Sequence, residues 1–209
     1  MTSLPNLSIY HFYAPIYDRF FRPLTLGPRR DTIRLLELQP GEQVLIPGVG
    51  TGLDLPMIPT GVRVTAGDIS PEMLKQAQEK AKGRLVELKH MDAQHLEFED
   101  ESFNAVLFTL VLSVVPDARA AFGEAWRVLR PGGRMAIFDK FMPEGRSLTP
   151  FRRMLGQVIR YFGTDPNRCL SEIVTGWAGL KVLKNNPSLL SGQYRIVLIE
   201  KGILSGVEK

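Results

Sequence analysis

Cysteine, histidine and long apolar runs are scarce in this chain of 209 residues. Cys169 is the only cysteine, so no disulfide can form within the chain. His11, His90 and His95 belong to no cluster with metal-ligand spacing and to no nucleophile motif. The sequence therefore predicts neither a metal site nor a catalytic triad. No apolar run approaches the roughly 20 residues that cross a bilayer.

A secretory signal is also lacking, because the N-terminus has neither a basic start nor a continuous apolar core. We therefore expect a cytoplasmic protein. With 44% hydrophobic and 23% charged residues, the composition is that of an ordinary globular protein. The length suits one α/β domain with short additions.

The net charge of +4 is concentrated in two flanks of the chain. Residues 1–34 hold five basic and two acidic residues, and residues 140–170 hold six and two. The same flanks contain ten of the aromatic residues. Basic residues interleaved with aromatic ones suit an anionic, partly apolar surface such as a membrane. Nucleic acid is a less suitable partner, because these aromatics follow helical apolar patterns rather than a strand platform.

Apolar runs alternate with amphipathic ones from residue 43 onwards, which is typical of a parallel sheet. Strands are predicted at 43–47, 62–68, 85–90, 103–112 and 133–140. One helix is predicted from Pro71, with Ser70 as its cap and Gly83 as its stop. A second helix is predicted after the capping residue Asp117, with Pro131 to Gly133 turning the chain into the fifth strand. Its apolar face consists of Phe122, Ala125, Trp126 and Leu129.

After residue 140 the pattern becomes helical and then ends in two short strands. About eight residues join these strands, too few for a crossover helix, so they must pair antiparallel. The sequence therefore predicts an α/β fold with a mostly parallel sheet, an antiparallel C-terminal hairpin and helices on both faces.

Three glycines, Gly48, Gly50 and Gly52, follow the first strand, where open α/β sheets bind ligands. Leu53 occupies the place where a dinucleotide fingerprint needs its last glycine, so a pyrophosphate is disfavoured. Asp68 ends the second strand, where a carboxylate can accept both hydroxyls of a ribose. Together these residues favour a nucleoside-type ligand. The alternative is a tight packing turn beside an ordinary helix-capping acid.

These segments resemble the class I S-adenosylmethionine-dependent methyltransferases. "VLIPGVGTG" is similar to their V-L-D-x-G-x-G-T-G turn, and "VTAGDIS" to their ribose-binding strand end. "HMDAQHLEFEDESFNAVLFTLVLSVVPD" resembles their adenine loop and the strand after it, and "EAWRVLRPGGRMAI" the start of strand five. The likeness covers residues 10–140. It implies a Rossmann-like, seven-stranded sheet, with S-adenosylmethionine as methyl donor and S-adenosylhomocysteine as product.

The resemblance also implies roles for the residues at matching positions. The turn at 48–52 would flank the methionine part of the donor, and Asp68 would bind its ribose. The other contacts would come from three pairs of residues. The turn consists of Gly48, Val49, Gly50, Thr51 and Gly52. Of the three pairs, Ile69 and Met73 would pack near the adenine, and Asp92 and Ala93 would contact its amine and ring. Thr109 and Leu110 would line the sulfonium.

Two residues depart from the family pattern. The family usually has an acid at the position of Ile46, and Pro47 follows it. Proline fits a strand end, where its missing N–H is not needed. Asp54 is a candidate to compensate for the lost acid, and we expect reduced donor affinity rather than loss of binding.

Within this class the sequence is most similar to bacterial phosphatidylethanolamine N-methyltransferases and related quinone methyltransferases. The likeness rests on "YAPIYDRFFRPLTLGPRR", "GVGTGLDLPMIP" and "VLSVVPD". It implies lid helices over the active site at 1–34 and a methyltransferase domain at 35–209. Residues 141–178 would be a helical insertion that forms part of the acceptor site. Such a lid could lie on anionic lipid at the inner face of the membrane.

Methyl transfer to an amine needs alignment more than a strong base. Tyr13, Tyr17, Ser113 and Asp139 are the candidates to orient the amine or accept its proton. The first hypothesis is a phospholipid N-methyltransferase that associates peripherally with the membrane. The alternatives are a quinone or other small-molecule methyltransferase, and a protein that binds S-adenosylmethionine without catalysis. We expect a monomer or a homodimer.

Overall fold

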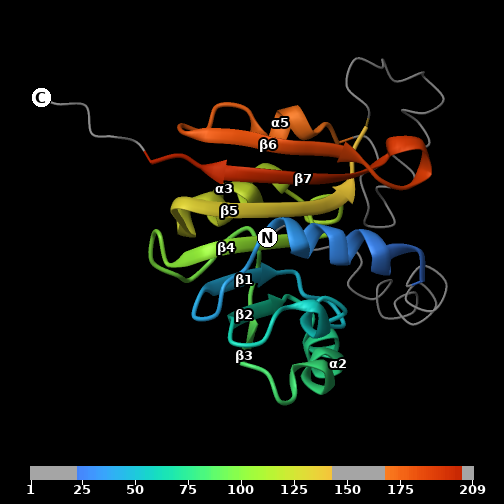
Figure 1. Cartoon of the computed structure of the whole chain (residues 1–209), viewed down its shortest axis with the longest axis vertical. Helices are drawn as coiled ribbons and strands as arrows, with labels where there is room; N and C mark the ends of the chain where they lie inside the picture. Colours follow the sequence, from blue (N-terminus) through green and yellow to red (C-terminus); the bar gives the residue numbers. More distant parts are fainter. Residues whose placement is uncertain (1–22, 143–167, 204–209) are drawn as a thin grey trace, which may run out of the picture.

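The computed structural model describes residues 23–142 and 168–203. Its strands form a single seven-stranded sheet in the order β3-β2-β1-β4-β5-β7-β6 (Figure 1). The strands are β1 (Gln43–Pro47), β2 (Arg63–Asp68), β3 (Val86–His90), β4 (Phe103–Thr109), β5 (Leu129–Lys140), β6 (Leu180–Pro187) and β7 (Tyr194–Lys201). The helices are α2 (Pro71–Ala81), α3 (Ala118–Val128) and α5 (Leu170–Val174), with the short 3-10 helices η1 (Leu55–Met57) and η2 (Leu190–Gly192). A further helix, called helix 23–35, covers residues 23–35.

The pairing confirms the predicted topology. β1 to β5 pair in parallel, whereas β7 runs antiparallel to both β5 and β6. The carboxyl ends of β1, β2, β4 and β5 therefore meet at one edge of the sheet. The strand order reverses between β1 and β4, and open α/β sheets bind ligands at such a switch point.

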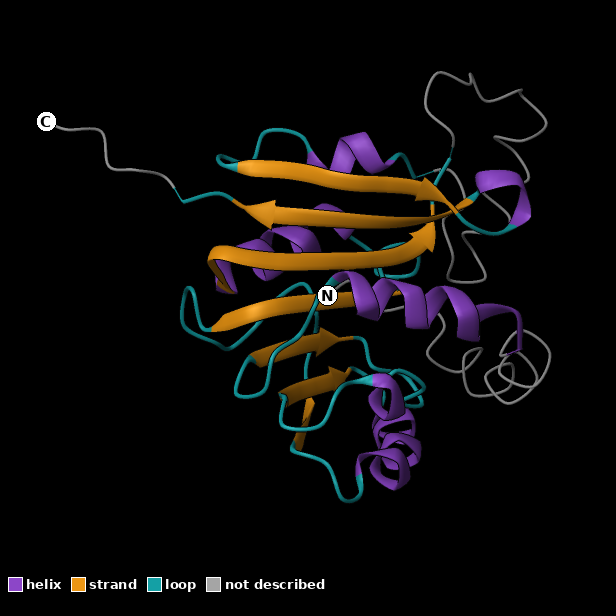
Figure 2. Ribbon diagram, in the orientation of Figure 1, coloured by secondary structure: helices purple, strands orange, loops and turns teal. Residues whose placement is uncertain are grey.

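Helices cover both faces of the sheet, as expected from the sequence. Helix 23–35 and α2 pack on one face, and α3 and α5 on the other (Figure 2). The first layer buries Ile33 and Leu36 against Ile46 of β1. The second buries side chains such as Phe122 and Ile173 against β4 and β5. Apolar layers thus cover both faces of the sheet. Polar functional groups are therefore expected at its carboxyl edge.

The predicted helix caps are confirmed. The Ser70 hydroxyl accepts a hydrogen bond from the backbone N–H of Met73, and Pro71 is the first residue of α2. The Asp117 carboxylate accepts from the backbone N–H of Ala120 at 2.9 Å. Each cap satisfies a backbone donor that the first helical turn leaves unpaired.

Strand β4 is shorter than predicted. It ends at Thr109 rather than at residue 112, because Leu110 has a φ of +58°. A left-handed residue cannot continue a strand, so the chain turns out of the sheet here. The N–H of Leu110 still donates to the carbonyl of Phe138 in β5, at 2.8 Å.

Strand β5 starts earlier than predicted. Leu129 pairs with Phe103, and the register then shifts so that Arg134 pairs with Ala105. The residues at 131–133 therefore lie within an irregular part of the strand instead of forming a turn before it. Leu129 belongs to this strand and not to the apolar face of α3, where it was predicted.

Two predicted segments fall largely outside the described residues. Residues 1–22 of the predicted lid and 143–167 of the predicted helical insertion are not described, so the division into lid, domain and insertion stays a prediction. The described part of the insertion includes α5. Within 23–142 and 168–203, no helix has the length and apolar character needed to cross a membrane.

Candidate functional site

The glycine turn, residues 48–52, leaves β1 at the carboxyl edge of the sheet. The N–H groups of Gly48 and Val49 both donate to the carbonyl of Gly67 in β2, each at 2.8 Å. A Cβ on Gly48 would lie 2.6 Å from Cγ2 of Val111, so close packing requires glycine there. Gly50 has a φ of +54°, and a Cβ on it would meet no atom of the described residues within 4 Å. The backbone at Gly50 therefore faces open space that a ligand can enter.

Asp68 ends β2 beside this turn. Its Oδ2 accepts from the N–H of Gly50 at 2.9 Å, and its Oδ1 accepts from the N–H of Ser70 at 3.0 Å. A carboxylate offers about four lone-pair positions, so acceptor capacity remains for a ribose hydroxyl. Burial raises the pKa of Asp68 above its ordinary value, while these backbone hydrogen bonds and the nearby His90 oppose the shift. The geometry fits the ribose contact predicted for Asp68.

The loop after β3 is fixed to the start of α3. The Asp92 carboxylate accepts from the backbone N–H and the side-chain amide of Gln94, at 2.9 and 3.0 Å. The Gln94 Oε1 in turn accepts from the N–H of Asp117 at 2.8 Å. Ala93 between them is buried. Asp92 and Ala93 are thus held in one defined position, as a binding loop requires.

Ile69 and Met73 lie on the connection between β2 and the first turn of α2. Ile69 is 39% exposed although it is a large apolar side chain, and its carbonyl lies 3.0 Å from Nε2 of His90. Met73 is half-buried. Ile69 offers an exposed apolar surface one residue after Asp68, which fits the predicted contact with an aromatic base.

The end of β4 carries two costly features. Thr109 is buried, and its Oγ1 has no hydrogen-bond partner within the part of the chain that the structure describes. Leu110 next to it has the left-handed backbone noted above. An unpaired buried hydroxyl costs about 1–3 kcal/mol, and such costs gather at functional sites. Their place at the switch point fits the predicted location of the sulfonium.

Ser113 and Asp139 are hydrogen-bonded to each other and are almost completely buried, at 1% and 0% exposure. The Asp139 Oδ2 accepts from the N–H of Ser113 at 3.1 Å, and its Oδ1 accepts from the N–H of Lys140 at 2.8 Å. Burial raises the pKa of Asp139. The pair joins the loop after β4 to the end of β5. The other candidate catalytic residues, Tyr13 and Tyr17, lie outside the described residues.

Two basic side chains that the sequence reasoning did not assign hold the loops of this edge. Lys80 of α2 donates from Nζ to the carbonyl of Thr51 at 2.6 Å. Arg168 donates to the carbonyls of Leu112, Val115 and Pro116, the last two at 2.6 and 2.9 Å. Both residues act on backbone carbonyls far away in sequence, so no local spacing could have indicated them.

The two departures from the family pattern receive different explanations. Pro47 is the last residue of β1 and pairs in register with Gly67, which confirms it as the strand end. Ile46 is buried in the apolar layer under helix 23–35. Asp54 is buried too, and its Oδ2 accepts from Nη1 of Arg29 at 2.8 Å. Asp54 is therefore bound to helix 23–35, a partner that the sequence did not indicate.

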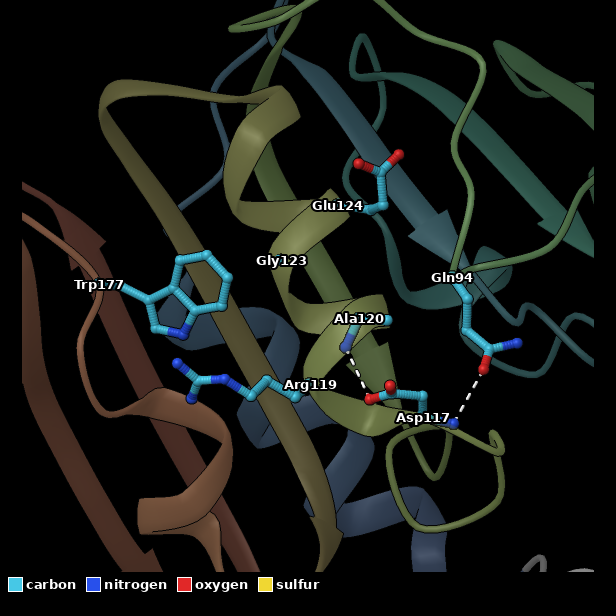
Figure 3. A pocket seen from close by; sticks show the side chains of 7 residues that line it. All are labelled: Gln94, Asp117, Arg119, Ala120, Gly123, Glu124 and Trp177. Atoms are coloured by element: carbon cyan, nitrogen blue, oxygen red, sulfur yellow. Dashed lines mark hydrogen bonds between the residues drawn. The ribbon is translucent and has the colours of Figure 1, made fainter.

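A surface hollow of about 470 Å³ lies beside α3, where Gln94 of the loop after β3 borders it (Figure 3). Arg119 forms part of its wall, donating to the carbonyls of Glu172 and Thr175, with its guanidinium 5.2 Å from the Trp177 ring centre. These contacts join α5 to α3. Neither the glycine turn nor Asp68 lines this hollow, so the polar groups at the carboxyl ends of β1, β2 and β4 define the candidate site. The hollow beside α3 is lined by Gln94, Asp117, Arg119, Ala120, Gly123, Glu124 and Trp177.

Comparison with known proteins agrees with this geometry. Residues 45–137 match a family model described as a methyltransferase domain. A phosphatidylethanolamine N-methyltransferase of Cereibacter sphaeroides is 33% identical over 190 residues, covering 89% of this chain and 93% of that protein. The ubiquinone/menaquinone biosynthesis C-methyltransferase UbiE of Desulfotalea psychrophila is 33% identical over 147 residues, covering 65% of this chain and 58% of that protein. A solved geranyl diphosphate methyltransferase in complex with SAM has the same fold, with a TM-score of 0.69, 17% identity and 85% of each chain covered.

The matched segment runs from β1 into β5 and so contains the glycine turn, Asp68 and the end of β4. The open backbone at Gly50 and the remaining acceptor capacity of Asp68 fit an adenosyl donor whose methionine part lies along the turn. The likeness to the Cereibacter protein extends over nearly the full length of both chains. This chain is a member of the class I S-adenosylmethionine-dependent methyltransferases, and S-adenosylmethionine is its methyl donor.

Proposed function

We propose that this methyltransferase acts on the amine headgroup of a phospholipid, phosphatidylethanolamine, at a membrane surface. The observation that carries the proposal is the match to the phosphatidylethanolamine N-methyltransferase of Cereibacter sphaeroides, which covers 93% of that protein. The match to the quinone methyltransferase UbiE covers 58% of its length. The lipid enzyme therefore shares with this chain segments that lie beyond the donor-binding core.

Methyl transfer from the donor to an amine requires mainly alignment of the two substrates. The donor supplies an electrophilic methyl group on a sulfonium that leaves readily. A bond forms between the headgroup nitrogen and the methyl carbon, the carbon–sulfur bond breaks with its electron pair staying on sulfur, and the ammonium proton is lost. Alignment alone can contribute roughly 7 to 11 kcal/mol in ideal cases. The chain must therefore hold both substrates firmly rather than supply a strong base.

Positioning of the acceptor falls to the loops beyond β4 and β5. Arg168 holds the loop at 112–116 by its carbonyls, and its own carbonyl accepts from the N–H of Met142 at 2.9 Å. Met142 and Arg168 are the described residues that border 143–167. The basic and aromatic segment at 140–170 thus starts and returns at the carboxyl edge of the sheet. Basic residues near an anionic surface contribute about 1 kcal/mol each, which supports placing this edge against the inner face of the membrane.

Four residues remain candidates to orient the amine or accept its proton: Tyr13, Tyr17, Ser113 and Asp139. The burial of Ser113 and Asp139, and their bonds to backbone N–H groups, favour a role in holding the loop after β4. A water molecule or a lid tyrosine would then receive the proton. Because alignment dominates the rate, this division of roles is compatible with efficient transfer.

The test is incubation with methyl-labelled donor and separate acceptors. Vesicles that contain phosphatidylethanolamine, vesicles of phosphatidylcholine alone and a demethylated quinone are the three arms. Label in the lipid fraction of the first arm only is the expected result. Label in the quinone arm only would replace the proposal by the quinone alternative.

Two alternative functions have observations in their favour. The UbiE match favours a quinone or another small acceptor, with the basic flanks serving packing or dimerisation. The buried Ile46 in place of the usual acid favours a protein that holds the donor without turnover. Donor binding without methyl transfer to any of the acceptors above would support the second of these.

A further inference from the structure

An ion pair connects helix 23–35 to the end of the glycine turn. Nη1 of Arg29 lies 2.8 Å from Oδ2 of Asp54, and the two side chains are 11% and 2% exposed. The two residues are 25 positions apart in sequence. Other ion pairs among the described residues are more exposed, for example Arg34 with Asp31 on the same helix, at 71% and 61%. The Arg29–Asp54 contact is therefore a buried link between two elements and not a surface contact.

The pair is poorly built for stability alone. Desolvating both charges is costly, and the cost is best offset by a bidentate contact that satisfies every polar atom. Here Nε of Arg29 and Oδ1 of Asp54 are buried and lack hydrogen-bond partners in residues 23–142 and 168–203. Two apolar side chains, Ile33 of helix 23–35 and Leu36 directly after it, already dock the helix on the sheet. The ion pair is thus not needed to attach the helix, which points to a different role.

Asp54 controls how the chain leaves the glycine turn. It lies two residues after Gly52 and directly precedes η1. The N–H of Leu55 donates to the carbonyl of Gly52 at 3.2 Å, and the N–H of Met57 donates to the carbonyl of Asp54 at 2.9 Å. A displacement of Asp54 would therefore move the carboxyl end of the turn.

The turn is then held from three directions by charged side chains. Asp68 of β2 accepts from Gly50, and Lys80 of α2 donates to Thr51. Arg29 holds the third side through Asp54. Ile46 stands where this family usually has an acid, and the third contact comes from a separate helix.

We propose that Arg29 is a positioning residue for donor binding. Through its ion pair with Asp54, helix 23–35 holds the glycine turn in the shape that accepts the methionine part of S-adenosylmethionine. The position of this helix and the affinity for the donor are therefore coupled. The adenosine part of the donor depends on Asp68 and on the loop at residues 92–94, which the ion pair does not contact.

Arg29→Met tests the proposal, because methionine keeps the length and apolar stem while removing the charge. Calorimetry would compare the dissociation constants of S-adenosylhomocysteine and of adenosine. We expect binding of the first to weaken roughly tenfold and binding of adenosine to stay unchanged. Equal weakening of both ligands would overturn the proposal, because general loosening of the fold affects both. Arg29→Lys, which keeps the charge, should recover much of the affinity.

A second variant separates positioning from stability. Arg29→Met leaves Asp54 buried and unpaired, so the melting temperature of this variant is expected to fall. Adding Asp54→Asn removes the isolated charge and should restore the melting temperature while the affinity for S-adenosylhomocysteine stays low. Recovery of both quantities would contradict a positioning role. Arg34→Met, on the same helix with an exposed partner, is the matched control and should change neither. The readouts are ligand binding and melting temperature, so they do not depend on the identity of the methyl acceptor.

Discussion

The carboxylate of Asp68 accepts a hydrogen bond from the backbone N–H of Gly50 at 2.9 Å, which ties the end of β2 to the middle of the glycine turn. The residue predicted to bind the ribose is therefore also a support of the turn predicted to flank the methionine part. Loss of Asp68 is therefore expected to affect the binding of both parts of the donor.

Asp68→Ala is expected to weaken donor binding by about 1–3 kcal/mol, because the ribose hydroxyls lose their acceptor and the turn loses a support. Titration calorimetry with S-adenosylmethionine measures the change. Asp31→Ala, on the exposed side of helix 23–35, is the control and should have no effect. An unchanged dissociation constant for Asp68→Ala would remove Asp68 from the donor site.

Gly50→Ala is expected to reduce donor affinity beyond its effect on stability. The added Cβ meets no atom within 4 Å in residues 23–142 and 168–203, so it would project into the space where the donor approaches. The left-handed backbone itself costs roughly 1–2 kcal/mol for alanine. Gly83→Ala is the matched control, because Gly83 has a φ of +72° and equally free surroundings at the end of α2. Both variants should lose similar stability by urea unfolding, but only Gly50→Ala should lose donor binding.

Much of the fold could be predicted because its signals are local. The strand bounds of β1, the cap at Ser70 and the short hairpin that forces antiparallel pairing all follow from neighbouring residues. The errors lie where tertiary contacts decide. Leu110 leaves the strand in a left-handed conformation that no leucine favours by itself, and Leu129 joins β5 because it pairs with Phe103.

In the candidate site, too, the residues with local sequence signals were predictable and those placed by tertiary contacts were not. Gly50 and Asp68 were predictable because a strand end and its turn have a known spacing, and the structure brings them into contact. Arg29, Lys80 and Arg168 were not, because each contacts a carboxylate or a carbonyl more than 20 residues away in the chain. Such contacts depend on how the elements pack and leave no pattern in the sequence.

Asp139→Asn is expected to flatten the pH dependence of stability. Burial raises the pKa of Asp139 in the folded state, so the folded protein binds more protons than the unfolded one between the two pKa values. The free energy of unfolding therefore falls as the pH rises through this window, and the stability from this group is complete only below the ordinary pKa of aspartate. Asparagine does not titrate, and its one amide oxygen can keep one of the two backbone hydrogen bonds, from Ser113 or from Lys140.

Urea unfolding at about pH 4 and about pH 8 measures this effect. The wild type should lose more stability than Asp139→Asn between the two values, since the comparison cancels the titration of the other groups. An identical loss in both proteins would show that Asp139 titrates normally.

Arg168→Met is expected to lower turnover roughly tenfold to a hundredfold while leaving the donor dissociation constant unchanged. The substitution frees the carbonyls of Val115 and Pro116, and with them the loop on the acceptor side, whereas the glycine turn keeps its own supports. Arg130→Met is the control, because Arg130 binds the carbonyl of Glu101 at the other end of β5. A loss of donor affinity in Arg168→Met would place Arg168 among the supports of the donor site instead.

The most direct test of the proposed function is transfer of labelled methyl from S-adenosylmethionine to phosphatidylethanolamine in vesicles that also contain anionic lipid. Extraction of the lipids and chromatography show whether label resides in the methylated headgroup. We predict label in that headgroup with the wild type and a strong reduction with Asp68→Ala. Donor binding by calorimetry without label in any lipid would contradict the proposal that phosphatidylethanolamine is the acceptor.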